Sequence, residues 1–146
     1  MSEDEIIYND ILNVLAVLIG FRHNQEEFKE FASIQLNIQQ NKRIEAMEKL
    51  VTLFDTNEIY IADMCRYQYA WLSFLHNETD SAKAMLIEIQ HETIYKELAH
   101  IFLAEIMDYI DKDISGAIDS YLEFLELYPN SIYYDDIRLR LRELTS

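Results

Sequence analysis

The chain has few of the residues that interrupt regular structure. Its 146 residues include two glycines, one proline and one cysteine. Sheet-rich folds depend on frequent glycine and proline turns, so this scarcity argues against a β-sandwich or barrel and favours helices with short polar connections. The lone Cys65 has no partner for an internal disulfide and lies in an apolar stretch typical of a packed helix. A chain of this length fits one domain.

Basic side chains are also scarce: 12 Lys and Arg stand against 27 Asp and Glu, for a net charge of -15. Proteins that bind nucleic acid need concentrated positive charge, so we expect no nucleic-acid ligand. The charge favours encounters with basic partners, although it can serve solubility alone. Between residues 97 and 126 the only basic residue is Lys112, and this acidic segment fits either a solvated helix face or a surface for a basic partner.

No apolar run is long enough to cross a bilayer. The longest, residues 11–21, has about half the required length and is interrupted by Asn13. It follows an acidic start instead of the basic region of a secretory signal. We therefore expect no membrane insertion. The compartment stays unknown: cytoplasmic for the chain as written, periplasmic if it is a fragment of an exported protein.

Apolar residues recur at helical spacing almost throughout the chain, and strand-like alternation is nearly absent. The predicted helices span residues 3–21, 25–39, 42–54, 58–75, 80–90, 93–110, 114–128 and 131–144. Short links make consecutive helices antiparallel hairpins. The predicted fold class is therefore all-α, an antiparallel helix-hairpin stack of about eight helices. An apolar helix begins the stack and a capping helix closes it.

A pattern of one small and two larger apolar residues repeats in three of these helices, after 36 and then 35 residues. The three sets are Ala46, Leu50, Leu53; Ala82, Leu86, Ile89; and Ala117, Tyr121, Phe124. The spacing of four and seven places each set on one helix face, with the small residue where a paired helix crosses closely. Two helices in about 34 residues is the period of tetratricopeptide repeats.

Residues 113–131 resemble the second half of a tetratricopeptide repeat, with its small residue at Ala117, its aromatic at Tyr121 and its closing proline at Pro129. Ala70 and Ala104 fit the small position of the first helix of a pair. The tail, residues 128–144, is similar to the C-terminal repeats of large bacterial proteins of this family.

The resemblance covers residues 25–144 and departs from the family pattern in three ways. Ile34 occupies the first small position, the first two repeats lack the proline, and the third carries one extra residue near Asp111. The resemblance implies a single domain, 1–146, with a covering helix (1–22), helix-pair repeats (25–57, 58–92, 93–130) and a capping helix (131–146).

In this family the first helix of each pair lines a concave groove, which implies a non-catalytic scaffold or adaptor that binds a protein or peptide. The residues that this pattern places near the groove are Phe28, Phe31, Gln35, Met64, Tyr67, Trp71, Ile101, Glu105, Asp108 and Tyr109. Aromatics with carboxylates suit a peptide with apolar and basic residues, with Trp71 and Tyr67 as main anchors. The alternative is that these aromatics form the core between helices, and the exposure of Trp71 distinguishes the two.

Two other functions stay open. The chain could be a structural homo-oligomer that uses residues 6–21, or a small acidic inhibitor or immunity-type protein that neutralises a basic partner. The first helix is expected to cover the stack, and because it is apolar all round, we expect part of it to contact another copy or a missing neighbouring repeat. The covering face is Ile6, Ile7, Ile11, Leu15, Leu18 and Ile19, and the opposite face is Leu12, Val14, Val17 and Phe21.

An enzyme is not expected, and neither is a metal or cofactor. Residues 88–91 and 97–100 are both Glu-x-x-His, the spacing that di-iron bundles use for ligands on one helix face. Those bundles take the two motifs from separate helices, whereas one short turn separates them here. Glycine-rich phosphate loops, nucleophile elbows, paired CxxC and HExxH motifs are absent from the sequence.

Overall fold

A computed structural model describes residues 3–146, with side chains from residue 11 onward. In this part of the chain there are eight α-helices and no strand, which confirms the all-α prediction. The elements are α1 Glu3–Phe21, α2 Gln25–Gln39, α3 Arg43–Leu50, a 3-10 turn Val51–Leu53, α4 Ile59–Leu75, α5 Thr79–Ile87, α6 Ile94–Glu105, a π-helical turn η2 Ile106–Ile110, α7 Ile114–Leu127 and α8 Tyr134–Thr145. None of the described helices is long and apolar enough to span a membrane.

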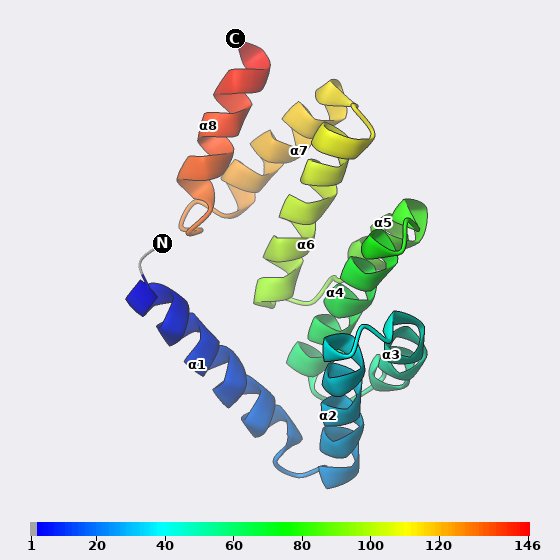
Figure 1. Cartoon of the computed structure of the whole chain (residues 1–146). Coiled ribbons are helices and arrows are strands. Elements are labelled where there is room, and N and C mark those ends of the chain that lie inside the picture. Colours follow the sequence, from blue (N-terminus) through cyan, green and yellow to red (C-terminus); the bar gives the residue numbers. More distant parts are fainter. Residues whose placement is uncertain (1–2) are drawn as a thin grey trace.

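The helices pack mainly against their neighbours in the sequence (Figure 1). From α2 to α8 each helix contacts the next, and α4 also contacts α6. All nine residues of the repeated apolar pattern are buried, with Ala46, Ala82 and Ala117 fully inaccessible. The predicted inward faces are therefore confirmed. Close helix approach at these alanines explains why a larger side chain would not fit.

Three helices are each followed by a residue in the left-handed conformation. Asn41, Asn77 and Lys112 have φ values of 60°, 64° and 58° and follow α2, α4 and η2. Backbone bonds from Lys42 to the carbonyl of Asn37 and from Glu78 to that of Ser73 close the first two ends, as in a Schellman motif. These turn residues recur with the same 36 and 35 residue spacing as the buried alanines.

The π turn η2 continues α6 at its C-terminal end. A π turn holds one more residue than an α turn, so the helix continues while its later side chains rotate to a new face. Asp108 accordingly turns into the interior, where its side chain is 1% exposed. The extra residue that the family resemblance implies near Asp111 would fit in such a turn without breaking the helix.

α1 packs across the start of α4 (Figure 1). Val17 and Phe21 face the core, and a Cβ on Gly20 would lie 2.8 Å from the side chain of Ile61. The predicted division of α1 therefore needs correction, because Val17 and Phe21 were assigned to the outer face. Ile11, Leu15, Leu18 and Ile19, which were assigned to the covering face, are instead 47 to 59% exposed. Ile6 and Ile7 lie outside the described side chains.

The start of α8 also differs from the prediction. The helix begins at Tyr134, not Ser131, and the Ser131 hydroxyl accepts a hydrogen bond from the Tyr133 amide in the preceding turn. The other boundaries agree with the predicted ranges to within about three residues, which is ordinary variation at helix ends.

Candidate functional site

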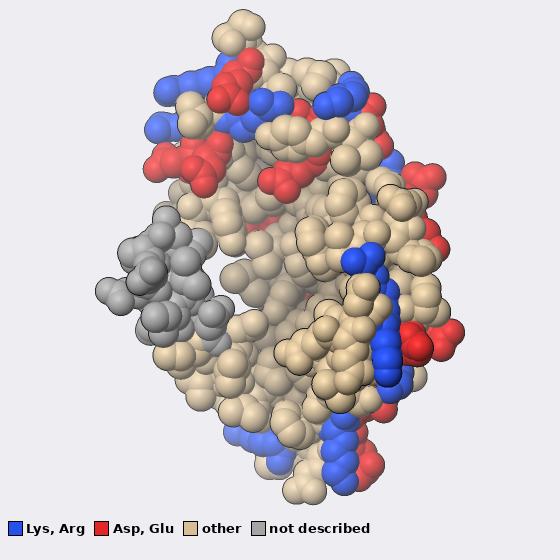
Figure 2. Space-filling view, viewed as in Figure 1, with Lys and Arg blue, Asp and Glu red and all other residues tan. Residues whose placement is uncertain are grey.

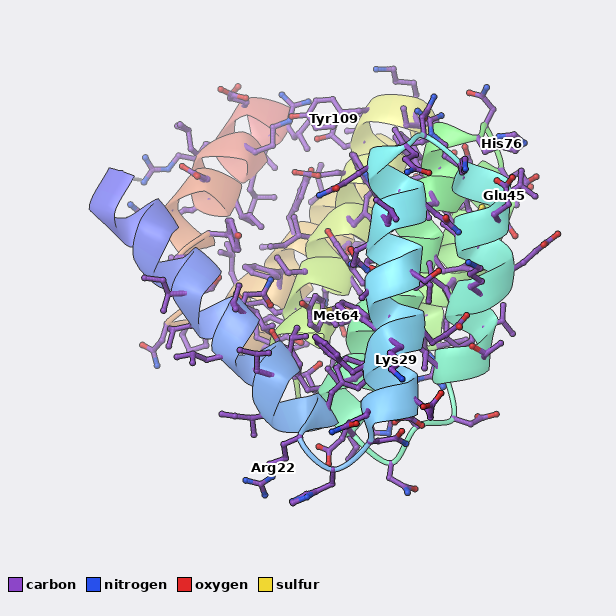
Figure 3. The ribbon with its side chains drawn as sticks, turned by 60° about the horizontal axis from the view of Figure 1, so that its bottom comes forward. Arg22, Lys29, Glu45, Met64, His76 and Tyr109 are labelled. Carbon is purple, nitrogen blue, oxygen red and sulfur yellow. The ribbon has the colours of Figure 1, made fainter. Side chains whose placement is uncertain are left out.

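The ten residues predicted to line a groove divide between surface and interior. Phe31, Met64 and Asp108 are buried and offer no surface to a partner. Figure 3 shows Met64 within the fold, behind α1 and α2, whereas Glu45 and His76 point away from it. The residues that keep some or much exposure are Phe28, Gln35, Tyr67, Trp71, Ile101, Glu105 and Tyr109.

Trp71, the only tryptophan of the chain, is the most exposed of the predicted aromatic anchors on α4. Its side chain is 46% exposed, so it is not a core residue. One side of the indole rests on Phe102 and Phe74, with ring centroids 5.6 and 6.0 Å away. Phe74 and Phe102 were not among the predicted residues. Their spacing could have suggested them, because Phe74 lies one turn after Trp71 on the same helix face.

A series of aromatic contacts aligns α4 with α6. Tyr60 contacts Tyr95 (5.3 Å between ring centroids), Tyr67 contacts both Tyr95 (5.7 Å) and Phe102 (6.1 Å), and Trp71 contacts Phe102. Because the residue numbers of the contacting rings increase together along α4 and α6, the two helices run side by side in the same direction. Trp71 is the exposed end of this row, Tyr60 and Tyr67 are partly buried, and Tyr95 and Phe102 are buried beneath them; this face is called the α4 and α6 surface below.

One end of this surface is bounded by α1. The Asn13 side-chain oxygen accepts hydrogen bonds from the hydroxyls of Tyr60 (2.7 Å) and Tyr95 (3.3 Å). Asn13 is the polar residue that interrupts the apolar run, and this interruption was the available signal for it. Between α1, α6 and the connection before α8 lies a cleft of about 600 Å³. Its lining includes Leu12, Ile94, Leu98 and Tyr133. Figure 2 shows this face hollowed in the middle, with charged side chains mainly around it.

Glu105 stands one helical turn after Phe102 on α6. The side chain as a whole is exposed, yet neighbouring groups desolvate the carboxylate and raise its pKa, and the negative charge of Asp108 adds to this. Burial raises the pKa of Tyr67 to about 12, and the charge of Glu105 contributes.

Asp108 and Tyr109 hold a guanidinium from α8. Arg140 donates two hydrogen bonds to the Asp108 carboxylate, from Nε and Nη2, both 2.8 Å long. Its guanidinium lies 4.9 Å from the ring centroid of Tyr109, which Figure 3 shows directed toward α8. The hydrogen bonds from Arg140 hold the pKa of Asp108 below its usual value, against the opposing effect of burial, and the Tyr121 hydroxyl contributes a further bond.

The two Glu-x-x-His motifs do not meet. His91 lies in the connection after α5, with Nδ1 3.0 Å from the Asp63 carboxylate, while His100 on α6 lies 3.0 Å from the carbonyl oxygen of Ser120. Among the described residues no group of three or more potential ligands could hold a metal ion. Cys65 is fully buried, and burial raises the pKa of its thiol to about 12, so the thiol stays protonated.

A second buried carboxylate, Asp63 on α4, joins the connection between α5 and α6 to the core. It accepts hydrogen bonds from the Thr93 hydroxyl (2.9 Å) and lies 3.7 Å from Arg66. The Nη1 atom of Arg66 is buried without a hydrogen-bond partner. Arg66 also donates to the Phe54 carbonyl, and its guanidinium stacks on the Phe54 ring at 5.3 Å. The arrangement links helices and presents no open chemical site.

Comparison of the chain with protein-family models, with curated proteins and with solved structures finds no match. The functional argument therefore depends on the geometry of the α4 and α6 surface.

Proposed function

We propose that this protein is a non-catalytic scaffold or adaptor whose α4 and α6 surface binds a partner protein or peptide. The carrying observation is Trp71, which is 46% exposed while one side of its indole rests on the buried ring of Phe102. Aromatic side chains that are anchored on one side and open on the other are typical hot spots of protein interfaces. The adjoining cleft and the carboxylate of Glu105 supply the concave and polar elements that a peptide site uses.

The fold proposed with this function is a tetratricopeptide-like stack of antiparallel helix pairs. Three observations support it: packing between successive helices, burial of the repeated alanines, and the left-handed turn residues with the same spacing. One pair of helices cannot shelter its apolar face alone, so stacked pairs stabilise each other and leave one side open for binding.

The experiment is quantitative affinity capture from native-cell extract with the wild type and Trp71→Ala, followed by titration of any purified captured protein. Because Trp71 is the only tryptophan, its fluorescence reports occupancy of the surface directly. We expect Trp71→Ala to weaken binding roughly thirtyfold, the effect of a hot-spot residue. That variant removes the fluorophore, so its affinity is measured by calorimetry.

Ile87→Ala is the matched control, because Ile87 is exposed on α5, away from the α4 and α6 surface. It removes a similar amount of exposed apolar side chain and should leave the affinity unchanged. Equal binding by the Trp71→Ala variant and the wild type would contradict the proposed surface.

We propose self-association through α1 as a second candidate function. Its outer stripe, Ile11, Val14, Leu15 and Leu18, is about half exposed and follows the heptad-like spacing of helix seams. Sedimentation velocity over a concentration series tests it: Leu15→Glu should convert a dimer to a monomer. Val51→Glu, at another half-exposed apolar position, should leave the dimer intact. A wild type that is monomeric at every concentration removes this candidate.

A further inference from the structure

Glu105 is a carboxylate without a cation. No ion pair joins it to any described residue, although the same structure pairs Asp63, Asp108 and Asp111 with Arg66, Arg140 and Lys83. It lies on α6 one turn after Phe102, whose ring contacts the exposed Trp71. The Glu105 side chain is exposed, and a positive charge placed beside it would favour its charged form.

Two other carboxylates of this protein lie close to both an arginine and an aromatic ring. Arg140 combines a bidentate pair with Asp108 and stacking on Tyr109, at 4.9 Å from the ring centroid. Arg66 likewise stacks on Phe54 and faces Asp63. In both cases one guanidinium lies against an aromatic ring and close to a carboxylate, as its planar, delocalised charge allows.

A carboxylate and an aromatic ring also occur together on α6, where Glu105 lies one helical turn after Phe102. Tyr67 and Trp71 both contact Phe102, and the contacts Tyr60–Tyr95 and Tyr67–Phe102, each 35 residues apart, place Glu105 close to the level of Trp71 along the two helices. Arg66 and Arg140 are already engaged with Asp63 and Asp108, and no ion pair joins Glu105 to a described residue, so Glu105 can receive a cation from a second molecule.

We propose that the α4 and α6 surface receives a cationic side chain, arginine above lysine, of a partner polypeptide, seated against Trp71 and Tyr67 with its charge at Glu105. This inference rests on the protein-binding function proposed above and specifies the partner. The net charge of -15 would steer a basic segment toward the protein, and the apolar Ile101 and Leu98 of α6 would contact uncharged neighbours of the cation.

The test is selection from a displayed library of random linear peptides, carried out on four folded proteins in parallel: wild type, Trp71→Ala, Glu105→Gln and Glu126→Gln. Glu126 is exposed on α7, so its variant removes the same charge from another surface and controls for nonspecific attraction of basic peptides. We expect the wild type and Glu126→Gln to enrich peptides with an arginine next to apolar residues. Glu105→Gln should lose the arginine preference, and Trp71→Ala should lose these peptides.

A titration of one enriched peptide then measures the cation directly, with Trp71 fluorescence as the signal. Replacing its arginine by citrulline, which keeps the shape and removes the charge, should weaken binding to the wild type at least about tenfold. The same replacement should change binding to Glu105→Gln by less than about threefold. Glu105→Gln is nearly isosteric and exposed, so circular dichroism should show an unchanged helical fold.

The outcomes separate the two proposals. Peptides that require Trp71 but show no arginine preference, or an arginine preference that survives in Glu105→Gln, overturn the cation site and leave the binding function standing. If no enriched peptide depends on Trp71, the binding surface itself is wrong, and the cation site falls with it.

Discussion

The two parallel helices of the candidate surface, α4 and the α6–η2 segment, each bury a polar side chain near the C-terminal end, but they satisfy its hydrogen bonds differently. Each ends at a left-handed residue, Asn77 or Lys112. Four residues before those ends stand Ser73 and Asp108, and both side chains are buried, at 0% and 1% exposure. The Ser73 hydroxyl donates to the carbonyl of Tyr69 in its own helix, whereas Asp108 is bonded to groups from α7 and α8.

The difference lies in what each side chain needs. A hydroxyl can satisfy itself within its own helix, but an ionised carboxylate accepts only and requires donors from elsewhere. Asp108 therefore attaches the C-terminal helix, which has only one buried apolar residue of its own, Ile137. The buried Ser73 thus links α4 to no other helix, whereas the buried Asp108 at the equivalent position joins the α6–η2 segment to α8; we call this link the Asp108 tether.

The largest expected effect comes from placing in the α6–η2 segment the residue type that α4 has at the equivalent position, serine. Asp108→Ser should lower the free energy of unfolding by about 2 kcal/mol, because the charge-assisted bonds to Arg140 are lost. Denaturant unfolding measures the total. Hydrogen exchange should show the amides of α8 losing protection before those of α4.

Ser73→Ala is the control at the equivalent position. Its self-contained hydrogen bond should contribute no more than about 1 kcal/mol, and its loss should leave exchange in α8 unchanged. Similar exchange patterns in the two variants would show that α8 is not held through Asp108, and the comparison would fail.

Acid should act selectively on the Asp108 tether. A carboxyl group whose pKa is lowered in the folded state stabilises the fold above its unfolded pKa, about 3.9, and this contribution is lost as the pH falls through the lower folded value. Below about pH 4 the wild type should therefore lose a stabilisation that Asp108→Ser never had, and their unfolding free energies should converge.

Glu105 contributes to stability with the opposite sign, because its pKa is raised and folding therefore disfavours its charged form relative to the unfolded chain. The pH series is therefore repeated in a Glu105→Gln background, where convergence below about pH 4 should persist. Unfolding curves that stay parallel from neutral to acid pH would contradict an ionised Asp108 tether.

The smallest expected effect concerns the left-handed residues themselves. Lys112→Gly should stabilise the protein by about 0.5 kcal/mol, because glycine removes the backbone strain while giving back part of the gain as unfolded-state entropy. Lys112→Ala removes the same charge without relieving strain and should not stabilise. Asn77→Gly should change little, since asparagine tolerates this conformation. Thermal unfolding of the three variants in parallel measures the order of their stabilities.

Much of the fold could be predicted because local patterns carry it. The helices, their polar ends and the nine inward residues follow from apolar spacing alone. The extra residue was visible because the distance between the alanines of paired helices grows from 12 residues (Ala70 to Ala82) to 13 (Ala104 to Ala117). The family resemblance itself stays a prediction. For the site, Trp71 and Tyr67 were named from the sequence, but the supporting rings of Phe74 and Phe102 were not, because they meet only when α4 and α6 lie side by side.

The faces of α1 show the limit most directly. All of residues 14–19 are apolar, so hydrophobicity could not choose an inner side, and the sequence alone assigned Val17 and Phe21 outward. Tertiary packing decided it: Asn13 pairs with two tyrosine hydroxyls, and Gly20 permits close approach to Ile61.

Periodicity by itself determined that this chain forms helices with buried alanines at regular intervals, because a helix repeats its faces over a few neighbouring residues. Which polar groups are satisfied was settled only by the tertiary structure. Asp108 receives Arg140 from 32 residues away, while Glu105, three residues before it, receives no cation from any described residue. Such partners are fixed by the relative placement of whole helices, which local spacing does not encode.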